Sequence, residues 1–329
     1  MCVYYFLGTS CLQWNQNPII VAGNGTLGNS SNLLNGPWDF SIDSYSNLYI
    51  SDGYNNRIIK YANGSLVGVS LTSGTGRGLN QVWNPSASII DTKGNLYVSD
   101  MYNFRIMKYA NISSTSRSPP ITGQVVAGGS FGNGYNQQWI SWGVAIDPSG
   151  NVFVSDYGYN RVMKWAPGAI TGSLVAGIGN GTGGNSSNQL SCPLGIYLDQ
   201  SLSLYIADAC NGRIQKWLSG SSTGITVAGA NGQINYPTDV SVDNYGIVYA
   251  WSGGGLYRFT PGSTWGTIVI SAYRVVFGFK FDSIGSVYIA DYGLNAILKY
   301  TLNSTQCSTY FCFSMLLNTK VNAFLFISP

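Results

Sequence analysis

Short stretches of alternating hydrophobic and polar residues recur along the chain, and Gly, Asn or Asp bounds each of them. This pattern is typical of short β-strands joined by tight turns. The clearest copies read NLYISDGYNNRIIKY at 47–61, NLYVSDMYNFRIMKY at 95–109, NVFVSDYGYNRVMKW at 151–165 and SLYIADACNGRIQKW at 203–217. Weaker copies are present at 247–259 and 286–300. Each copy predicts two antiparallel strands around one turn.

An aspartate inside the pattern gives the repeat length. Successive copies are 48, 56, 52, 44 and 39 residues apart, a spacing typical of propeller blades with loops of variable length. A further apolar segment precedes each copy, and another, such as 173–177, follows it. Each unit therefore predicts four strands, called a to d. The repeated positions are Asp52, Asp100, Asp156, Asp208 and Asp291, with Ser252 in the fifth copy.

The number of strands indicates how the ring closes. Six sets of strands a to c are present, a strand d follows the first five, and one extra strand, 19–23, precedes the first set. We expect this N-terminal strand to complete the sixth blade, because closure removes the exposed edge of an open array. The prediction is an all-β, six-bladed β-propeller of four-stranded blades at 19–301, with a lead-in at 1–18 and an apolar tail at 302–329.

The repeated unit P-x-x-x-x-x-D-x-x-G-N-x-Y-V-x-D-x-x-N-x-R-I-x-K-[YW] resembles the NHL repeat. The resemblance extends over about residues 19–301, and four copies keep the aspartate, arginine and lysine in register. The fifth copy lacks the aspartate and the arginine, and the sixth has Ala296 in place of the arginine. The resemblance implies the fold and leaves the activity open.

Composition limits the chemistry. Charged residues are 9% of the chain, the net charge is +3 and there is no histidine, which is the commonest general base and catalytic metal ligand. No GxxxxGK phosphate-binding motif is present. Gluconolactonase-like propellers hold a divalent cation with carboxylates, but the only carboxylates outside the repeat, Asp39 and Asp239, are in different blades. A non-catalytic role without cofactor or metal is favoured, with a metal-dependent hydrolase or lactonase as the alternative.

The charged residues of the repeat are interpreted as structural. Each aspartate is five residues from its arginine, across the turn between strands b and c, where a pair of this kind would hold the blade together. Ten of the 16 basic residues are at repeat positions, so little remains for a nucleic-acid patch. An intracellular NHL domain that binds RNA or protein stays open as a third hypothesis. The structural pairs are Asp52 and Arg57, Asp100 and Arg105, Asp156 and Arg161, and Asp208 and Arg213.

Aromatic residues gather where the b–c turns and the d–a loops of a propeller share one face. Tyrosine and tryptophan supply rigid contact area with a hydrogen-bonding tip, so this face is suited to a protein, peptide or glycan ligand. The alternative is that these rings only pack between blades. The candidate binding residues are Tyr54, Tyr102, Tyr157, Tyr159, Trp38 and Trp142.

The six cysteines favour an extracellular location. The ends of strands a and b predict a Cys192–Cys210 disulfide, and ring closure predicts Cys11–Cys307, which leaves Cys2 and Cys312. Buried free thiols are the alternative. No clear signal peptide begins the chain, no apolar run is long enough to span a membrane, and a monomer is expected. Glycosylation sequons are present at Asn24, Asn29, Asn63, Asn111, Asn180, Asn185 and Asn303.

Overall fold

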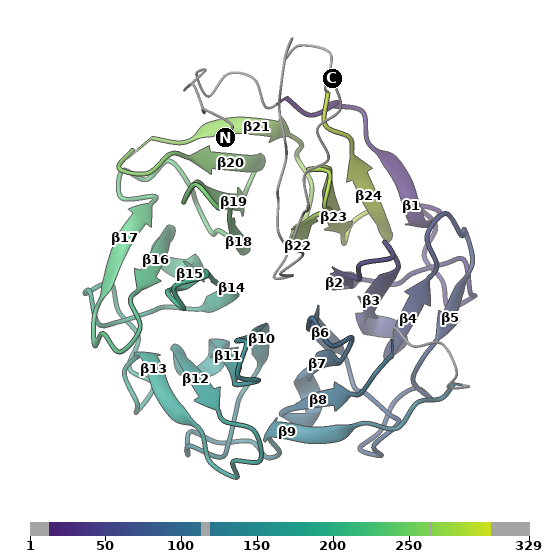
Figure 1. Cartoon of the computed structure of the whole chain (residues 1–329), viewed down its shortest axis with the longest axis horizontal. Helices are drawn as coiled ribbons and strands as arrows, with labels where there is room; N and C mark the ends of the chain where they lie inside the picture. The colour runs from purple at the N-terminus through teal and green to yellow at the C-terminus, as the bar shows by residue number, and fades with distance from the viewer. Residues whose placement is uncertain (1–12, 113–118, 264, 304–329) are drawn as a thin grey trace, which may run out of the picture.

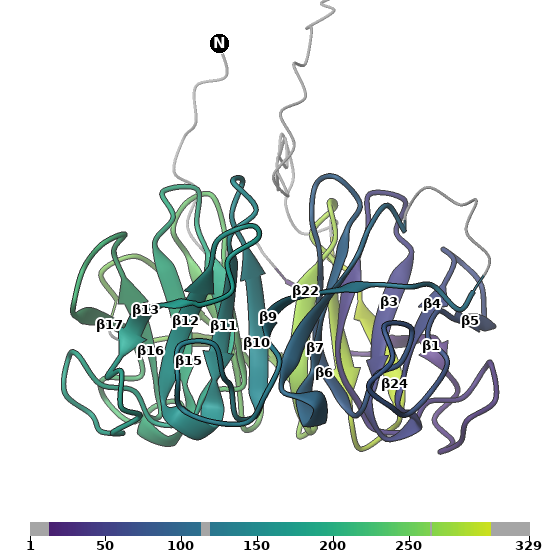
Figure 2. The same ribbon diagram turned by 90° about the horizontal axis from the view of Figure 1, so that it is seen from below.

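Six four-stranded antiparallel sheets surround a central axis in the structure, a computed structural model that describes residues 13–112, 119–263 and 265–303 (Figure 1). Strand a of each sheet lies nearest the axis and strand d lies at the rim (Figure 1). Seen from the side, the ring is a disc whose turns and loops form two opposite faces (Figure 2). The predicted six-bladed β-propeller is confirmed. No helix in the described part of the chain has the length and apolar character to span a membrane.

The blades follow one another along the chain. Blade 1 contains β2 (Pro37–Ile42), β3 (Leu48–Asp52), β4 (Arg57–Tyr61) and β5 (Gly68–Ser70). Blade 2 contains β6 (Pro85–Ile90), β7 (Leu96–Asp100), β8 (Arg105–Tyr109) and β9 (Gln124–Gly128). Blade 3 contains β10 (Ser141–Ile146), β11 (Val152–Asp156), β12 (Arg161–Trp165) and β13 (Ser173–Gly177). Blade 4 contains β14 (Pro193–Leu198), β15 (Leu204–Asp208), β16 (Arg213–Trp217) and β17 (Gly224–Ala228). Blade 5 contains β18 (Asp239–Val242), β19 (Val248–Ser252), β20 (Gly255–Phe259) and β21 (Thr267–Ser271).

Blade 6 combines both ends of the propeller. It contains β22 (Val276–Phe281), β23 (Val287–Asp291) and β24 (Ala296–Tyr300), and its fourth strand is β1 (Ile19–Gly23). β1 pairs antiparallel with β24, so that Ile19 lies opposite Lys299 and Gly23 opposite Ala296. Figure 1 shows the purple β1 beside the yellow-green β24. Closure by the N-terminal strand is therefore confirmed, and β1 covers the edge of β24 that would otherwise be exposed.

The hydrophobic core lies between adjacent blades. Strand b is buried along its whole length in every blade, because neighbouring blades cover both of its faces. Trp165 and Trp217, at the ends of strands c, are each about 1% exposed and fill the spaces between blades. Each of these rings is large enough to bury 150–250 Å² of surface in a typical core. Packing between blades thus replaces a single central core.

The repeated aspartate and arginine connect the b–c turn to the preceding loop. In blade 2 the Asp100 Oδ2 accepts a hydrogen bond from Arg105 Nε at 2.7 Å, and its Oδ1 accepts one from the backbone N–H of Trp83 at 2.6 Å. The guanidinium of Arg105 also donates to the carbonyls of Arg77 and Gly78. Blades 1, 3 and 4 repeat this arrangement. The pair therefore fixes the d–a loop against its own blade.

The sixth blade preserves the ion pair with a different arginine. Ala296 stands at the position of the repeat arginine, and Arg274, from the loop before β22, donates to Asp291 Oδ2 at 2.6 Å. In the fifth blade Ser252 replaces the aspartate, and its hydroxyl accepts a hydrogen bond from the N–H of Asn235 and donates to the carbonyl of the same residue. The loop is thus held in both degenerate copies by other groups.

Removing one of these carboxylates should destabilise the fold strongly. Asp156→Ala leaves Arg161, whose side chain is 0% exposed, without its carboxylate partner. A buried charge that loses its partner costs about 3–5 kcal/mol. We expect the free energy of unfolding in urea to fall by that amount, whereas Tyr245→Ala, at a 71% exposed position, should change it by less than about 0.5 kcal/mol. A loss below about 1 kcal/mol for Asp156→Ala would contradict the structural role.

Candidate binding face

The b–c turns and the d–a loops lie together on one face of the ring. Four of the turns are single 3₁₀ turns: η1 (Gly53–Asn55), η2 (Met101–Asn103), η3 (Tyr157–Tyr159) and η4 (Ala209–Asn211). Backbone hydrogen bonds join the turns to the loops, as from the N–H of Tyr54 to the carbonyl of Asn35 and from the N–H of Tyr102 to the carbonyl of Trp83. Side chains from both sets therefore reach the same surface, at the mouth of the central channel.

A pocket of about 340 Å³ opens at this mouth, and none of its lining side chains carries a charge. The second residue of several inner strands forms its floor. Tyrosines from the turns and from the loop before β18 form its wall. The lining residues are Trp38, Tyr54, Asn84, Met101, Tyr102, Ile140, Trp142, Tyr157, Leu194, Tyr236 and Phe277.

The floor consists of aromatic rings in mutual contact. The centroid of Trp38 lies 5.2 Å from that of Trp142 and 4.8 Å from that of Phe277, and the Trp142 and Phe277 centroids are 5.2 Å apart. Tyr292 lies against Trp38 at 4.8 Å. The Trp38 Nε1 donates to Asn84 Oδ1 at 2.9 Å, which fixes the ring. These edge-to-face and tilted ring contacts hold one another in place, so the floor is preorganised.

Two phenols of the wall, those of Tyr54 and Tyr236, are neutral hydrogen-bonding groups. The Tyr54 and Tyr292 hydroxyls are 3.0 Å apart, and this hydrogen bond, with burial, raises the pKa of Tyr54. Burial and a hydrogen bond with Tyr157 raise the pKa of Tyr236 to about 12. At physiological pH these groups therefore present O–H donors and acceptors without charge.

The structure brings most of the predicted binding residues together. Five of the six line the pocket, and Tyr159 does not: its ring lies against Trp139 and over the guanidinium of Arg161. The sequence reasoning missed Phe277 and Tyr236. Phe277 occupies the same place in its inner strand as Trp38 and Trp142, so the alignment of the repeats contained the signal. The residues in the pocket are Trp38, Tyr54, Tyr102, Trp142 and Tyr157.

A group of three charged residues lies farther along the inner strands, inside the channel. Lys280 Nζ lies 2.8 Å from Asp39 Oδ1 and 3.1 Å from Asp239 Oδ2, so one ammonium bridges carboxylates of blades 1 and 5. The glycines beside them make room, because a Cβ at Gly278 would collide with the Asp39 carboxylate and one at Gly195 with that of Asp239. Lys280 was not among the predicted residues, since the link depends on three blades.

Burial governs the ionisation of Asp39. Its side chain is 15% exposed, and desolvation raises its pKa to about 6 although the Lys280 ammonium opposes the shift and the Asp239 carboxylate adds to it. The bridging ammonium lies between the only carboxylates outside the repeat. In the described ranges, no three Asp or Cys side chains come together as a metal site requires. The Lys280 ammonium thus occupies the place between these two carboxylates that a divalent cation would need.

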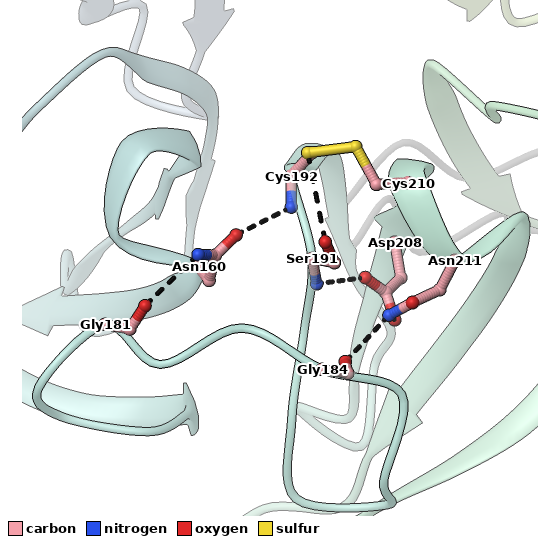
Figure 3. The surroundings of a disulfide bond; sticks show 8 residues. All are labelled: Asn160, Gly181, Gly184, Ser191, Cys192, Asp208, Cys210 and Asn211. Carbon is pink, nitrogen blue, oxygen red and sulfur yellow. Dashed lines mark hydrogen bonds between the residues drawn. A yellow bond between two sulfur atoms is a disulfide. The ribbon is translucent and has the colours of Figure 1, made fainter.

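A disulfide lies on the same face, in blade 4. Cys192, just before β14, is bonded to Cys210 in η4, with an S–S distance of 2.08 Å and a Cα–Cα distance of 5.4 Å. The N–H of Cys192 donates to Asn160 Oδ1 of blade 3 at 2.9 Å (Figure 3). The pairing expected from the ends of strands a and b is therefore present. The other predicted pair, Cys11 with Cys307, and the remaining Cys2 and Cys312 lie outside the described residues.

The sequence of the repeat indicates the family. A family model described as the NHL repeat matches residues 190–217, which include β14, β15 and β16. The same strand pattern and the same aspartate–arginine geometry recur around the closed ring. The chain is an NHL-repeat β-propeller.

Comparisons with whole proteins show the fold alone. No curated protein matches the sequence of this NHL-repeat propeller significantly. Among solved structures, a gluconolactonase from Xanthomonas campestris has a TM-score of 0.62 and 14% identity over 92% of this chain and 100% of the other. Virginiamycin B lyase from Staphylococcus aureus has a TM-score of 0.57 and 13% identity over 83% and 86%. A streptogramin B lyase has a TM-score of 0.54 and 13% identity over 84% and 96%.

Ionisation of Asp39 should make stability depend on pH. Its pKa is about 6 in the folded chain against an ordinary value of 3.8, so between these pH values the folded state binds more protons than the unfolded state. The stabilisation is therefore complete below about pH 4 and is lost as the pH rises through 6. We expect the advantage of wild type over Asp39→Asn in urea unfolding to shrink by up to about 3 kcal/mol between about pH 4 and pH 7.5. A difference that stays constant with pH would contradict this assignment.

Proposed function

We propose that this NHL-repeat propeller is a non-catalytic, extracellular binding protein that recognises a protein, peptide or glycan through the face described above. The observation that carries the proposal is the pocket of about 340 Å³ at the channel mouth, lined by aromatic and uncharged side chains. Ligand pockets in proteins have this character: a concave, largely apolar surface with a few polar groups that orient the ligand.

The polar groups of the pocket favour recognition over catalysis. Proton transfer at neutral pH needs a group whose pKa is near 7, and the phenols of Tyr54 and Tyr236 have raised pKa values. The carboxylate of Asp39 has a pKa of about 6, but it is held by Lys280 inside the channel and does not line the pocket. The wall can therefore donate and accept hydrogen bonds, which is what binding requires.

An extracellular location is supported by the disulfide and by the sequons. The Cys192–Cys210 disulfide is typical of proteins in an oxidising compartment. The asparagines of the sequons are exposed on loops and turns, where a glycan has room. They are Asn24, Asn29, Asn63, Asn111, Asn180, Asn185 and Asn303.

A second candidate function is a hydrolase or lactonase of the propeller class. The similarity in fold to a gluconolactonase favours it. Against it, Lys280 bridges Asp39 and Asp239, the two carboxylates that a cation would need. Stoichiometric calcium or zinc in the pure protein, together with lactone hydrolysis that Asp39→Asn abolishes, would establish this function in place of binding.

Truncating the wall should remove ligand binding. Tyr54→Ala and Tyr102→Ala each delete a ring that is about half exposed at the pocket. Central aromatic residues of a binding site typically cost 2 kcal/mol or more when truncated, so we expect affinity to fall about thirtyfold. The measurement is binding to peptide and glycan arrays, followed by titration of the best ligand. Tyr245→Ala, on the opposite face, is the control, and equal binding by all three variants would refute the proposed face.

The proposed location makes a separate prediction. Protein expressed through a secretory route should contain the Cys192–Cys210 disulfide and glycans on the exposed sequons, because both modifications need the secretory environment. Disulfide mapping and mass measurement before and after enzymatic removal of N-glycans test this. Well-folded protein with a free thiol at Cys192 and no glycan would indicate an intracellular interaction module instead.

A further inference from the structure

A second group of aromatic side chains lies on the same face, over the boundary between blades 2 and 3. It consists of Phe104, Phe131, Trp139 and Tyr159, which we call the seam cluster. Phe131 is 54% exposed and Trp139 is 40% exposed, and their ring centroids are 6.0 Å apart in an edge-to-face arrangement. None of the four lines the pocket. Exposed apolar surface of this size on a soluble protein often marks a binding site.

The seam cluster adjoins the pocket. Trp139 precedes Ile140, which lines the pocket, and Tyr159 is in the same 3₁₀ turn as Tyr157, which also lines it. The position of Trp139 is fixed on two sides. Its N–H donates to Asp156 Oδ1 at 2.9 Å, and its ring lies so close over Gly158 that a Cβ there would collide with it. The exposed rings are therefore held rigidly beside the pocket.

Two residues at the seam adopt a left-handed backbone conformation that is uncommon for their residue types. Phe104 has a φ of 56° and a ψ of 41°, in the left-handed region. The equivalent turn positions hold Asn56, Asn160 and Gly212, residue types that tolerate this conformation. A bulky residue there is uncommon, and retained strain is frequent at functional sites. At the same boundary Ile140, a β-branched residue, has a φ of 37°.

Phe104 also stands where other turns have an asparagine that forms a hydrogen bond to the next blade. The side chain of Asn56 accepts a hydrogen bond from the N–H of Asn84 in the next blade at 2.8 Å, and that of Asn160 accepts one from the N–H of Cys192. A phenyl ring cannot accept this bond. It contacts Phe131 instead, with the centroids 5.5 Å apart. Phenylalanine at this position thus adds a ring to the seam cluster, and the boundary between blades 2 and 3 lacks the asparagine hydrogen bond that joins blades 1 and 2 and blades 3 and 4.

The charge of the surroundings indicates the ligand. The carboxylates nearest the cluster, Asp100 and Asp156, are fully buried and paired with arginines. The exposed Arg77 beside the cluster donates to the carbonyl of Gly129. Apart from this guanidinium, the accessible surface consists of aromatic rings with hydroxyl and amide groups. This combination matches a neutral sugar, whose apolar ring face stacks on an aromatic side chain while its hydroxyls form hydrogen bonds.

We propose that the seam cluster is a second subsite for an elongated, neutral glycan. One sugar occupies the pocket, and a following sugar of the same chain stacks on Phe131 and Trp139. This inference rests on the proposed binding function and narrows its ligand to a glycan chain that extends from the channel mouth over blades 2 and 3.

The test is titration with neutral oligosaccharides of increasing length, using β-1,4-linked glucose and β-1,4-linked N-acetylglucosamine oligomers, followed by tryptophan fluorescence and calorimetry. Wild type should bind an oligomer more tightly than the single sugar. Trp139→Ala and Phe131→Ala should reduce affinity for the oligomer about tenfold and leave that for the single sugar unchanged. Tyr245→Ala, which removes an exposed ring from the opposite face, is the matched control and should bind both like wild type.

Phe104→Asn separates a binding role from a folding role. Asparagine tolerates the left-handed conformation and can accept the missing hydrogen bond between blades, so the melting temperature should stay the same or rise. Affinity for the oligomer should fall, because the ring that supports Phe131 is gone. Loss of affinity accompanied by a lower melting temperature would assign Phe104 to folding and overturn its role in the subsite.

The remaining outcomes separate this inference from the proposed function. Seam variants that bind the oligomer like wild type, while Tyr54→Ala does not, would refute the second subsite and leave the binding face intact. Peptide binding that Tyr54→Ala abolishes, without any oligosaccharide binding by wild type, would refute the glycan and keep the function. Binding unaffected by Tyr54→Ala would refute both.

Discussion

The buried carboxylate at the end of strand b is the group on which the face with the pocket depends. In most blades it accepts one hydrogen bond from the backbone of the d–a loop and one from the arginine of strand c, whose guanidinium then reaches the carbonyls of the same loop. Burial raises the pKa of Asp100 and Asp208. The oxygens of each carboxylate nevertheless accept hydrogen bonds from a loop N–H, from the asparagine of the turn and from the arginine of strand c. Because the ends of the loop are held in this way, its tip is free to differ in length and composition from blade to blade. The aromatic rings of the face are carried on these fixed loops and turns.

Local pattern was sufficient to predict the architecture. The period of the repeat, the alternation within each strand and the spare strand before the first blade lead to a closed ring of six blades, and antiparallel geometry then places Cys192 beside Cys210. These features follow from residues close together in sequence or from the need to cover a sheet edge. The alignment of strands a also indicates that Trp38 and Trp142 lie at equivalent places near the channel mouth.

The relations between different blades were not predictable from the same pattern. Lys280 bridges Asp39, 241 residues away, and Asp239, 41 residues away, and such a contact depends on the curvature of the whole ring. Arg274 supplies the guanidinium missing at Ala296 from a loop that has no fixed register with the repeat. Tyr159 turns away from the pocket because Trp139 and Phe131 offer it a contact across the seam, which a single blade does not reveal.

Every blade contributes at least one residue to the lining of the pocket: Trp38 from blade 1, Tyr102 from blade 2, Trp142 from blade 3, Leu194 from blade 4, Tyr236 from the entry to blade 5, and Phe277 from blade 6. The last of these blades is complete only when β1 pairs with β24. A chain that lacks any one of the six blades therefore cannot assemble the complete lining of the pocket. The pocket is thus a property of the closed ring and not of any single repeat.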